Sequence, residues 1–230
     1  MENNPQDIDE KIHDCAQRIE SYFRQNGPTP EQYGSLNRLF ARWHQFRETE
    51  RKECHDLERS WSRREPVFRT ASNIGHAYCK PYGYAGDFEL IDRMYRRQIS
   101  RHPGIRRWDQ FFQQQPGSAA IRHRKERFLE LIQNLRQERP QGTYVLILGA
   151  GPARELLEAF QADPDYRLHG DCVEQDPAAV AYAKKLLEPF SGRVQFLQRN
   201  ALRFQPPGTY HLVWSAGLFD YFNDQTFVQL

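Results

Sequence analysis

The sequence has few cysteines, no long apolar run and almost no net charge, and each lack excludes a class of protein. Its four cysteines stand far apart in 230 residues, which favours a reducing compartment over a disulfide framework. No run of about 18 apolar residues occurs, so no membrane-spanning helix is predicted. The 32 lysines and arginines balance 30 aspartates and glutamates to a formal charge of +2, which excludes a strongly basic nucleic-acid-binding surface.

Apolar and aromatic residues, by contrast, are plentiful. Hydrophobic residues make up 39% of the chain and include 15 Phe, 11 Tyr and 4 Trp, enough to fill a core. The first residues, Met1 to Glu10, are polar and acidic, unlike a signal peptide. We therefore expect a folded, soluble protein of the cytoplasm.

Helical spacing dominates the first 139 residues. Two apolar stripes flank a break at residues 27–30: Ile12, Cys15, Ile19 and Tyr22 before it, and Tyr33, Leu36, Phe40 and Trp43 after it. The charged stretch 47–64 is interpreted as a solvated helix face. Further helices are predicted after Asp87, burying Leu90, Ile91, Met94 and Tyr95, and near Ser118, carrying Ile121, Phe128, Leu131, Ile132 and Leu135. We predict an α-helical N-terminal region over residues 1–139.

From residue 140 onward short apolar runs replace the helical spacing. The continuous apolar run at 144–148 is typical of a parallel strand that is buried on both faces. A weaker strand is predicted at 168–173 and two further strands at 194–197 and 210–214, and helical segments separate the first three. This alternation predicts an α/β domain over residues 140–230, with a right-handed, doubly wound, Rossmann-like parallel sheet.

A glycine motif follows the first predicted strand. Gly149, Ala150 and Gly151 stand between that strand and a predicted helix, where glycines allow a sharp turn and close approach of a ligand. Dinucleotide-binding proteins carry a third glycine at the sixth position of their motif, and Arg154 occupies it here. NAD and FAD are therefore disfavoured, and no GxxxxGK[ST] loop for a nucleoside triphosphate is present.

Polar residues follow the second predicted strand. Glu174, next to Gln175, has the spacing of a ribose-binding acid, whose carboxylate can accept hydrogen bonds from both vicinal hydroxyls. Because it lies at an open strand end, we expect its loss to cost ligand binding rather than stability. Asp176 before Pro177 is predicted to be a structural helix cap.

The third and fourth strands also end in residues suited to a ligand. Asn200, followed by Ala201, could present its amide to an adenine edge, and the alternative is a simple turn. Ser215 and Gly217 are small enough to admit a ligand close to the backbone. Ligands of open α/β sheets lie at the carboxyl ends of the strands, where all of these residues are expected.

An upstream loop at residues 79–87 combines two glycines and a proline, with Asp87 predicted to cap the next helix. Two interpretations stay open. The loop is either a structural clamp between the helical region and the sheet, or it lines an active site with Lys80, Tyr82 and Tyr84. Metal binding is not expected, because the histidines and cysteines show no paired CxxC or HExxH spacing.

The order of these elements resembles the class I S-adenosylmethionine (SAM)-dependent methyltransferases over residues 144–222. The resemblance implies the following contacts: the methionine portion at Gly149 and Gly151, the ribose at Glu174, the adenine at Asn200 and the transfer site at Ser215 and Gly217. Two positions depart from the family pattern. Ile147 stands where many members have an acid, and Ala153 replaces a third glycine. Glu155 is a candidate substitute for the missing acid.

Three segments narrow the resemblance. KPYGYAGD at 80–87, GAGPARE at 149–155 and SAGLFDY at 215–221 are similar to a bacterial subgroup known as 3-hydroxypalmitic acid methyl ester biosynthesis proteins. The resemblance implies methyl transfer to a hydroxy fatty acid carboxylate, producing a diffusible bacterial signal. It also implies that Tyr82 or Tyr84 meets the sulfonium and that Lys80 holds the carboxylate.

Members of this family normally have three more strands than the sequence provides, so we expect a truncated chain with an open sheet edge. The leading hypothesis is a SAM-dependent methyltransferase acting on a small-molecule acceptor, with no nucleic-acid partner. The alternative is a non-catalytic SAM-binding module whose sheet edge is covered by a partner chain or a second copy. A nucleic-acid methyltransferase rests only on the basic segment 122–127, and no Asn-Pro-Pro-Tyr-like signature follows the fourth strand.

Overall fold

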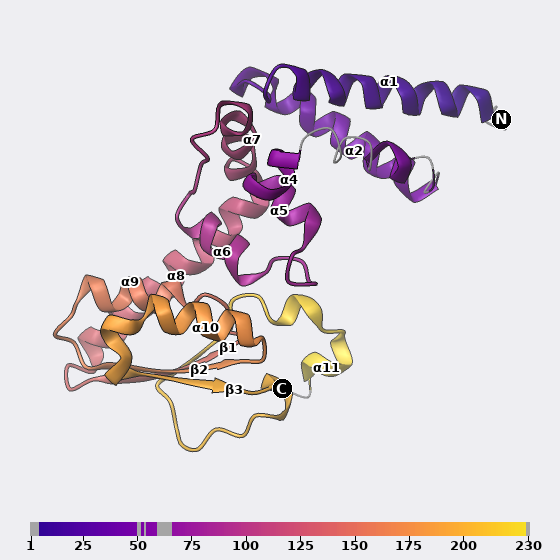
Figure 1. Ribbon diagram of the computed structural model, residues 1–230. Coiled ribbons are helices and arrows are strands. Elements are labelled where there is room, and N and C mark those ends of the chain that lie inside the picture. The colour runs from indigo at the N-terminus through magenta and orange to yellow at the C-terminus, as the bar shows by residue number, and fades with distance from the viewer. Residues whose placement is uncertain (1–4, 50–51, 53, 59–65, 229–230) are drawn as a thin grey trace. The chain divides into compact units, whose positions relative to one another are not determined.

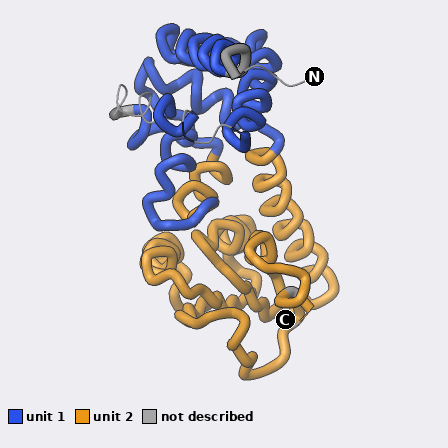
Figure 2. Tube along the Cα trace, turned by 90° about the vertical axis from the view of Figure 1, so that its right-hand side faces the viewer, with its two compact units in different colours: residues 1–85, 97–116 blue, residues 86–96, 117–230 orange. Residues whose placement is uncertain are grey.

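The computed structural model describes residues 5–49, 52, 54–58 and 66–228 (Figure 1). The chain divides into two compact units (Figure 2). The helical unit comprises residues 1–85 and 97–116, and the sheet unit comprises residues 86–96 and 117–230. The expected division at residues 139 and 140 stays a prediction, and two helices from the first 139 residues belong to the sheet unit.

The helical unit contains α1 (Pro5–Arg24), η1 (Pro30–Gln32), α2 (Tyr33–Thr49), α4 (Pro66–Ala71), α5 (Asn73–Cys79) and α7 (Pro103–Gln113). Both predicted stripes join one core, in which Ile12, Ile19, Leu36 and Trp43 are buried. Within the charged stretch 47–64, which was interpreted as a solvated helix face, residues 50–51, 53 and 59–64 lie outside the described residues.

Sequence periodicity missed α7, although two of its five buried residues are aromatic. Trp108 and Phe111 lie three residues apart on this helix, and both belong to the core of the helical unit. The Trp108 ring stands 4.7 Å from the ring of Phe23, measured between centroids. The local signal for α7 was its start, because His102 caps the helix and Pro103 occupies its first turn.

The sheet unit is built on β1 (Thr143–Leu148), β2 (Leu168–Glu174), β3 (Val194–Gln198) and β4 (Leu212–Trp214). The strands pair in parallel in the order β3-β2-β1-β4. The connecting elements are α9 (Arg154–Ala162), α10 (Pro177–Leu186), η2 (Glu188–Arg193) and η3 (Ala201–Arg203), and η4 (Phe219–Tyr221) and α11 (Asp224–Val228) follow β4. This arrangement confirms the predicted α/β, Rossmann-like parallel sheet.

Three helices cover one face of this sheet. Figure 1 shows α9 and α10 on that face, and α8 (Pro116–Glu138) adds Phe128, whose ring stands 5.5 Å from that of Trp214. A Cβ at Gly170 of β2 would lie only 2.7 Å from Leu156 Cδ2, so glycine permits the close approach of α9. On β1 and β4, Tyr144 and Val213 alternate with core residues and remain 53% and 57% exposed.

The sheet unit also contains α6 (Phe88–Tyr95). Its predicted inner face is confirmed for Leu90, Met94 and Tyr95, whereas Ile91 is only half-buried. On α8, Phe128 and Ile132 are buried, and the other predicted core residues are half-buried: Ile121, Leu131 and Leu135. Among the described helices, none is long and apolar enough to cross a membrane.

Candidate functional site

The glycine loop between β1 and α9 has an unusual backbone. Gly149, Gly151 and Ala153 have φ angles of +66°, +51° and +50°, all in the left-handed region. This conformation suits glycine, but alanine adopts it only at a cost in free energy. Two backbone bonds fasten the loop to β2, because the amides of Gly149 and Ala150 donate to the carbonyl of Val173 at 2.9 and 3.2 Å.

The two glycines of this loop have different surroundings. A Cβ at Gly149 would lie 3.1 Å from Cβ of Leu218, which follows β4, so packing within the chain already requires a small residue there. At Gly151 the nearest described atom to such a Cβ is Cβ of Phe88, at 3.9 Å. Gly151 is therefore the position of the loop where a ligand can approach the backbone.

Glu174 is tied to the glycine loop. Its Oε2 accepts a hydrogen bond from the Gly151 amide at 2.9 Å, and its Oε1 accepts from the amides of Gln175 and Asp176 at 2.8 and 3.0 Å. A carboxylate offers about four lone-pair positions, so roughly one, on Oε2, is left for a ligand hydroxyl. The expectation that Glu174 matters for binding but not for stability is therefore revised: its loss removes three backbone contacts.

The next two polar residues cap helices. Asp176 accepts from the Ala178 amide at 2.8 Å at the start of α10, which confirms the predicted structural cap. Asn200 accepts from the Leu202 amide at 2.9 Å and begins η3, to which Ala201 belongs. The structure thus gives Asn200 the turn that was the alternative interpretation, and its contact with adenine stays a prediction.

The segment after β4 lies against α8. Arg124 of α8 donates to the carbonyl of Ala216 and pairs with Asp220 at 3.3 Å, and its Nη1 is 3.3 Å from the Cβ position of Gly217. Among the described atoms, the buried Oγ of Ser215 has no hydrogen-bond partner. An unpaired buried hydroxyl is costly unless a water or ligand completes it.

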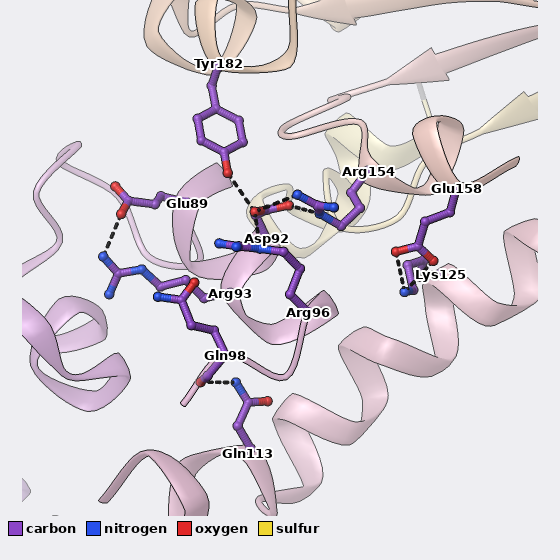
Figure 3. Close-up of polar contacts among 10 residues, drawn as sticks. All are labelled: Glu89, Asp92, Arg93, Arg96, Gln98, Gln113, Lys125, Arg154, Glu158 and Tyr182. Atoms are coloured by element: carbon purple, nitrogen blue, oxygen red, sulfur yellow. Dashed lines mark hydrogen bonds and ion pairs between the residues drawn. The ribbon is translucent and has the colours of Figure 1, made fainter. Parts of the chain in front are cut away.

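A buried carboxylate that the sequence did not reveal joins three helices (Figure 3). The Asp92 side chain of α6 is fully buried and binds both Nε and Nη2 of Arg154 of α9. Tyr182 of α10 donates to its Oδ2 at 2.6 Å, and Arg96 Nε lies 2.8 Å from the same oxygen. Burial, followed by the bond to Asp92, raises the pKa of Tyr182 to about 12. We refer to these four side chains as the Asp92 cluster.

Glu155, the residue after Arg154, has the opposite environment. Only 3% of it is exposed, and its Oε2 has no hydrogen-bond partner among the described atoms. Burial raises the pKa of its carboxyl from 4.5 to about 7. Lys125 of α8 pairs instead with Glu158, one turn further along α9, at 2.6 Å.

In the upstream loop at residues 79–87, the backbone changes direction at Lys80 and Gly83, whose φ angles are +45° and +85°. Lys80 caps α5, and its carbonyl accepts from the Gly83 amide at 2.8 Å. Tyr82 is 38% exposed and Tyr84 is half-buried. Lys80, Tyr82 and Tyr84 belong to the helical unit, whereas the glycine loop belongs to the sheet unit, so their role at one active site stays a prediction.

The end of this loop belongs to the sheet unit. Asp87 is 1% exposed and accepts from the amides of Glu89 and Leu90 at 3.1 and 3.0 Å, which confirms the predicted cap of α6. The hydroxyl of Tyr221 lies 3.6 Å from the Cβ position of Gly86. The last residues of KPYGYAGD and SAGLFDY, far apart in the sequence, therefore meet beside the sheet.

Comparison with known proteins gives partial matches. No protein-family model matches the chain. Over 89 residues the chain is 39% identical to the ribosomal RNA small subunit methyltransferase H of Synechococcus sp. (strain CC9311). That match covers 36% of this chain and 27% of the relative, so the chain spans about a quarter of the length of the relative it matches.

Two solved structures are also similar. A possible exported protein from Bordetella parapertussis matches 99% of this chain and 68% of its own, with a TM-score of 0.57 at 17% identity, which shows a shared fold alone. YjhP from E. coli matches 41% of this chain and 37% of its own at 24% identity, with a TM-score of 0.35.

Proposed function

We propose that the chain binds S-adenosylmethionine at the glycine loop and takes part in methyl transfer to a small molecule. The observation that carries the proposal is the geometry of the loop. Gly151 is open to a ligand, and its amide donates to Glu174 at the end of the neighbouring strand, which fixes the loop in place. Dinucleotide-binding motifs have a third glycine at the sixth position. Here that position is Arg154, whose side chain binds Asp92, so a dinucleotide is disfavoured. The partial match to a methyltransferase supports the same class.

The residues at this edge of the sheet fit the parts of the cofactor. The loop Gly149, Ala150 and Gly151 would hold the methionine portion, and the remaining lone pair of Glu174 would accept one ribose hydroxyl bond. The adenine would lie near Gln175, Asn200 and Ala201. Ser215 and Gly217 would border the transfer site, where the unpaired Ser215 hydroxyl offers a polar contact.

The chain contributes position and exclusion of water to the chemistry. When bound, the cofactor supplies a methyl group on a sulfonium whose leaving group is a neutral thioether. A carboxylate acceptor is already ionised, so no general base is required of this chain. Leu218 and Phe88 flank the two glycines and would keep water from the bound group. Alignment and desolvation would then supply most of the rate.

The acceptor follows from the sequence resemblance, which favours a hydroxy fatty acid carboxylate and a role in bacterial signalling. Under this proposal Lys80 binds the acceptor carboxylate, and Tyr82 or Tyr84 faces the sulfonium. RNA is the competing acceptor, given the name of the Synechococcus relative. Three cations of segment 122–127 argue against it, because Arg124, Lys125 and Arg127 each pair with a carboxylate of this chain. None of the four cysteines forms a disulfide bond, which favours a cytoplasmic location.

A second candidate is a SAM-binding module that is active only with a partner. The observation that favours it is β4, an edge strand of three residues that leaves Val213 57% exposed. A partner chain or a second copy could extend the sheet there.

Calorimetric titration with SAM and NAD tests the cofactor, and tighter binding of NAD would overturn the proposal. A methyl-release assay with hydroxy fatty acids and with RNA tests the acceptor. Light scattering on the same samples separates the two candidates. Full activity of the monomer would eliminate the partner-dependent module.

A further inference from the structure

The first turn of α9 contains a buried carboxylate that forms no ion pair with the described residues. Glu155 is the second residue of this helix, directly after the glycine loop, and it is 3% exposed. Its Oε2 is buried and has no hydrogen-bond partner among the described atoms. Its carboxylate bonds to its own backbone amide, and helical side chains lean toward the N-terminus of their helix. Glu155 is therefore turned toward the end of α9 that meets the glycine loop.

Lys125 of α8 lowers the pKa of the Glu155 carboxyl through its charge, but its ion pair is with another residue. On its own helix, Glu158 binds the ammonium of Lys125 from α8, at 2.7 Å for Oε1 and 2.6 Å for Oε2. From α6, Asp92 adds negative charge, although Arg154 and Arg96 pair with it. Tyr95 of α6 and Cys172 of β2 add no charge, because burial raises both of their pKa values and keeps the two side chains neutral.

This arrangement suits one end of a zwitterion. The N-terminus of α9 is the positive end of the helix dipole and favours an anion such as an α-carboxylate. The buried Glu155 carboxylate in the same turn favours an ammonium, because a buried charge needs a partner. Ile147 leaves the end of β1 without the acid that would otherwise receive such a group. Glu155 is thus the acid that the glycine loop has within its own motif.

We infer that Glu155 binds the α-amino group of the methionine portion of the cofactor. The inference rests on the proposed function and names the residue that distinguishes the intact cofactor from an adenosyl fragment. It also implies that binding of the cofactor is coupled to loss of the proton from the Glu155 carboxyl. Glu155 must ionise to pair with an ammonium, so binding should strengthen as the pH rises from about 6 to about 8.

The test compares two ligands on three proteins by calorimetry. S-adenosylhomocysteine has the amino acid portion, and 5′-methylthioadenosine lacks it. Glu155→Gln should weaken binding of the first about ten- to a hundredfold and change binding of the second less than about twofold. Asp163→Asn is the matched control, because it removes a charge at the C-cap of the same helix, where Asp163 pairs with Arg136 at 2.7 Å. Both of its affinities should stay at the wild-type value.

The pH series supplies a second measurement that needs no variant. For the wild type, affinity for S-adenosylhomocysteine should rise about tenfold from pH 6 to pH 8, while affinity for methylthioadenosine stays level. Equal losses for both ligands in Glu155→Gln, or an unchanged affinity for S-adenosylhomocysteine, would overturn the inference and leave the proposed function standing. If the wild type binds neither ligand, the proposed function fails and the inference fails with it.

Discussion

Two neighbouring residues of α9 lie in opposite electrostatic surroundings. Arg154 contributes to the Asp92 cluster, in which a fully buried carboxylate is bound by two guanidinium groups and a phenol. Glu155 is also buried, but its Oε2 lacks a hydrogen-bond partner among the described atoms. A satisfied polar network fixes one packing arrangement, whereas an unsatisfied carboxylate costs stability until a ligand completes it. The contrast separates a structural region of the sheet unit from the region that we propose binds the cofactor.

The largest effect should come from Asp92→Ala. This change leaves Arg154, which is 13% exposed, without its counter-ion and removes the acceptor of Tyr182. Breaking a buried pair in this way costs about 3–5 kcal/mol. Urea unfolding should show this loss, whereas Asp14→Ala, which breaks an exposed pair with Arg18, should cost about 0.5 kcal/mol or less. Similar losses in the two variants would remove the distinction between a buried and a surface pair.

The second effect concerns Glu155 in the absence of ligand. Its folded pKa of about 7 exceeds the ordinary value of 4.5, so the folded chain holds this proton more tightly than the unfolded chain. Stability is therefore fully present below about pH 4.5 and declines as the pH rises toward and through 7. Glu155→Gln removes this decline, so it should be more stable than the wild type by up to about 3 kcal/mol at pH 8. Paired melting curves at pH 5 and pH 8 measure the difference. A variant that is less stable at both would show that the carboxylate is satisfied.

Glu174→Ala should lower both stability and affinity, whereas Glu155→Gln should lower affinity alone. Loss of the Gly151, Gln175 and Asp176 contacts should cost about 1–3 kcal/mol of unfolding free energy. SAM binding should weaken about tenfold to a few hundredfold, because the ribose contact and the loop position are lost together. Glu174→Gln should fall between the wild type and the alanine variant. Thermal melts and SAM titrations on the same samples test the coupling, and unchanged stability would show that the loop holds its shape without Glu174.

The smallest effect should come from Asp176→Ala. This side chain caps α10 through the Ala178 amide, so its loss should cost about 1 kcal/mol and change SAM affinity little. Thermal melts and SAM titrations of this variant measure the two effects. If this variant abolishes binding while Glu174→Ala retains it, the assignment of the ribose acid at the end of β2 is wrong.

The parts of the fold that could be predicted depend on local patterns. A continuous apolar run identified β1, because a strand buried on both faces has no polar alternation to obscure it. Asp87 and Asp176 were predictable caps, since each precedes its helix directly. The edge strand β4 is shorter than predicted and begins at Leu212 rather than Tyr210, because the Tyr144 amide of β1 donates to the His211 ring instead of to a backbone carbonyl.

The parts that could not be predicted depend on partners distant in sequence. Asp92 has the spacing of an ordinary surface acid, and the residues that bury it, Arg154 and Tyr182, lie 62 and 90 positions away. The position of Glu174 was predictable, but its attachment to Gly151 was not, because backbone amide donors have no sequence signature. Glu155 could be singled out as an acid within a glycine motif, but only the structure revealed its burial.

The placement of α6 has a consequence for the order in which the chain acquires its structure during synthesis. The helical unit needs residues 97–116, yet residues 86–96, which precede them, belong to the sheet unit. Asp92 leaves the ribosome well before Arg154 and Tyr182, so for 62 to 90 further residues its carboxylate remains in water. Domains generally fold as units, and the earlier one folds first. The helical unit should therefore form around an undocked α6, and the arrival of Tyr182 should complete the attachment of this helix to the sheet.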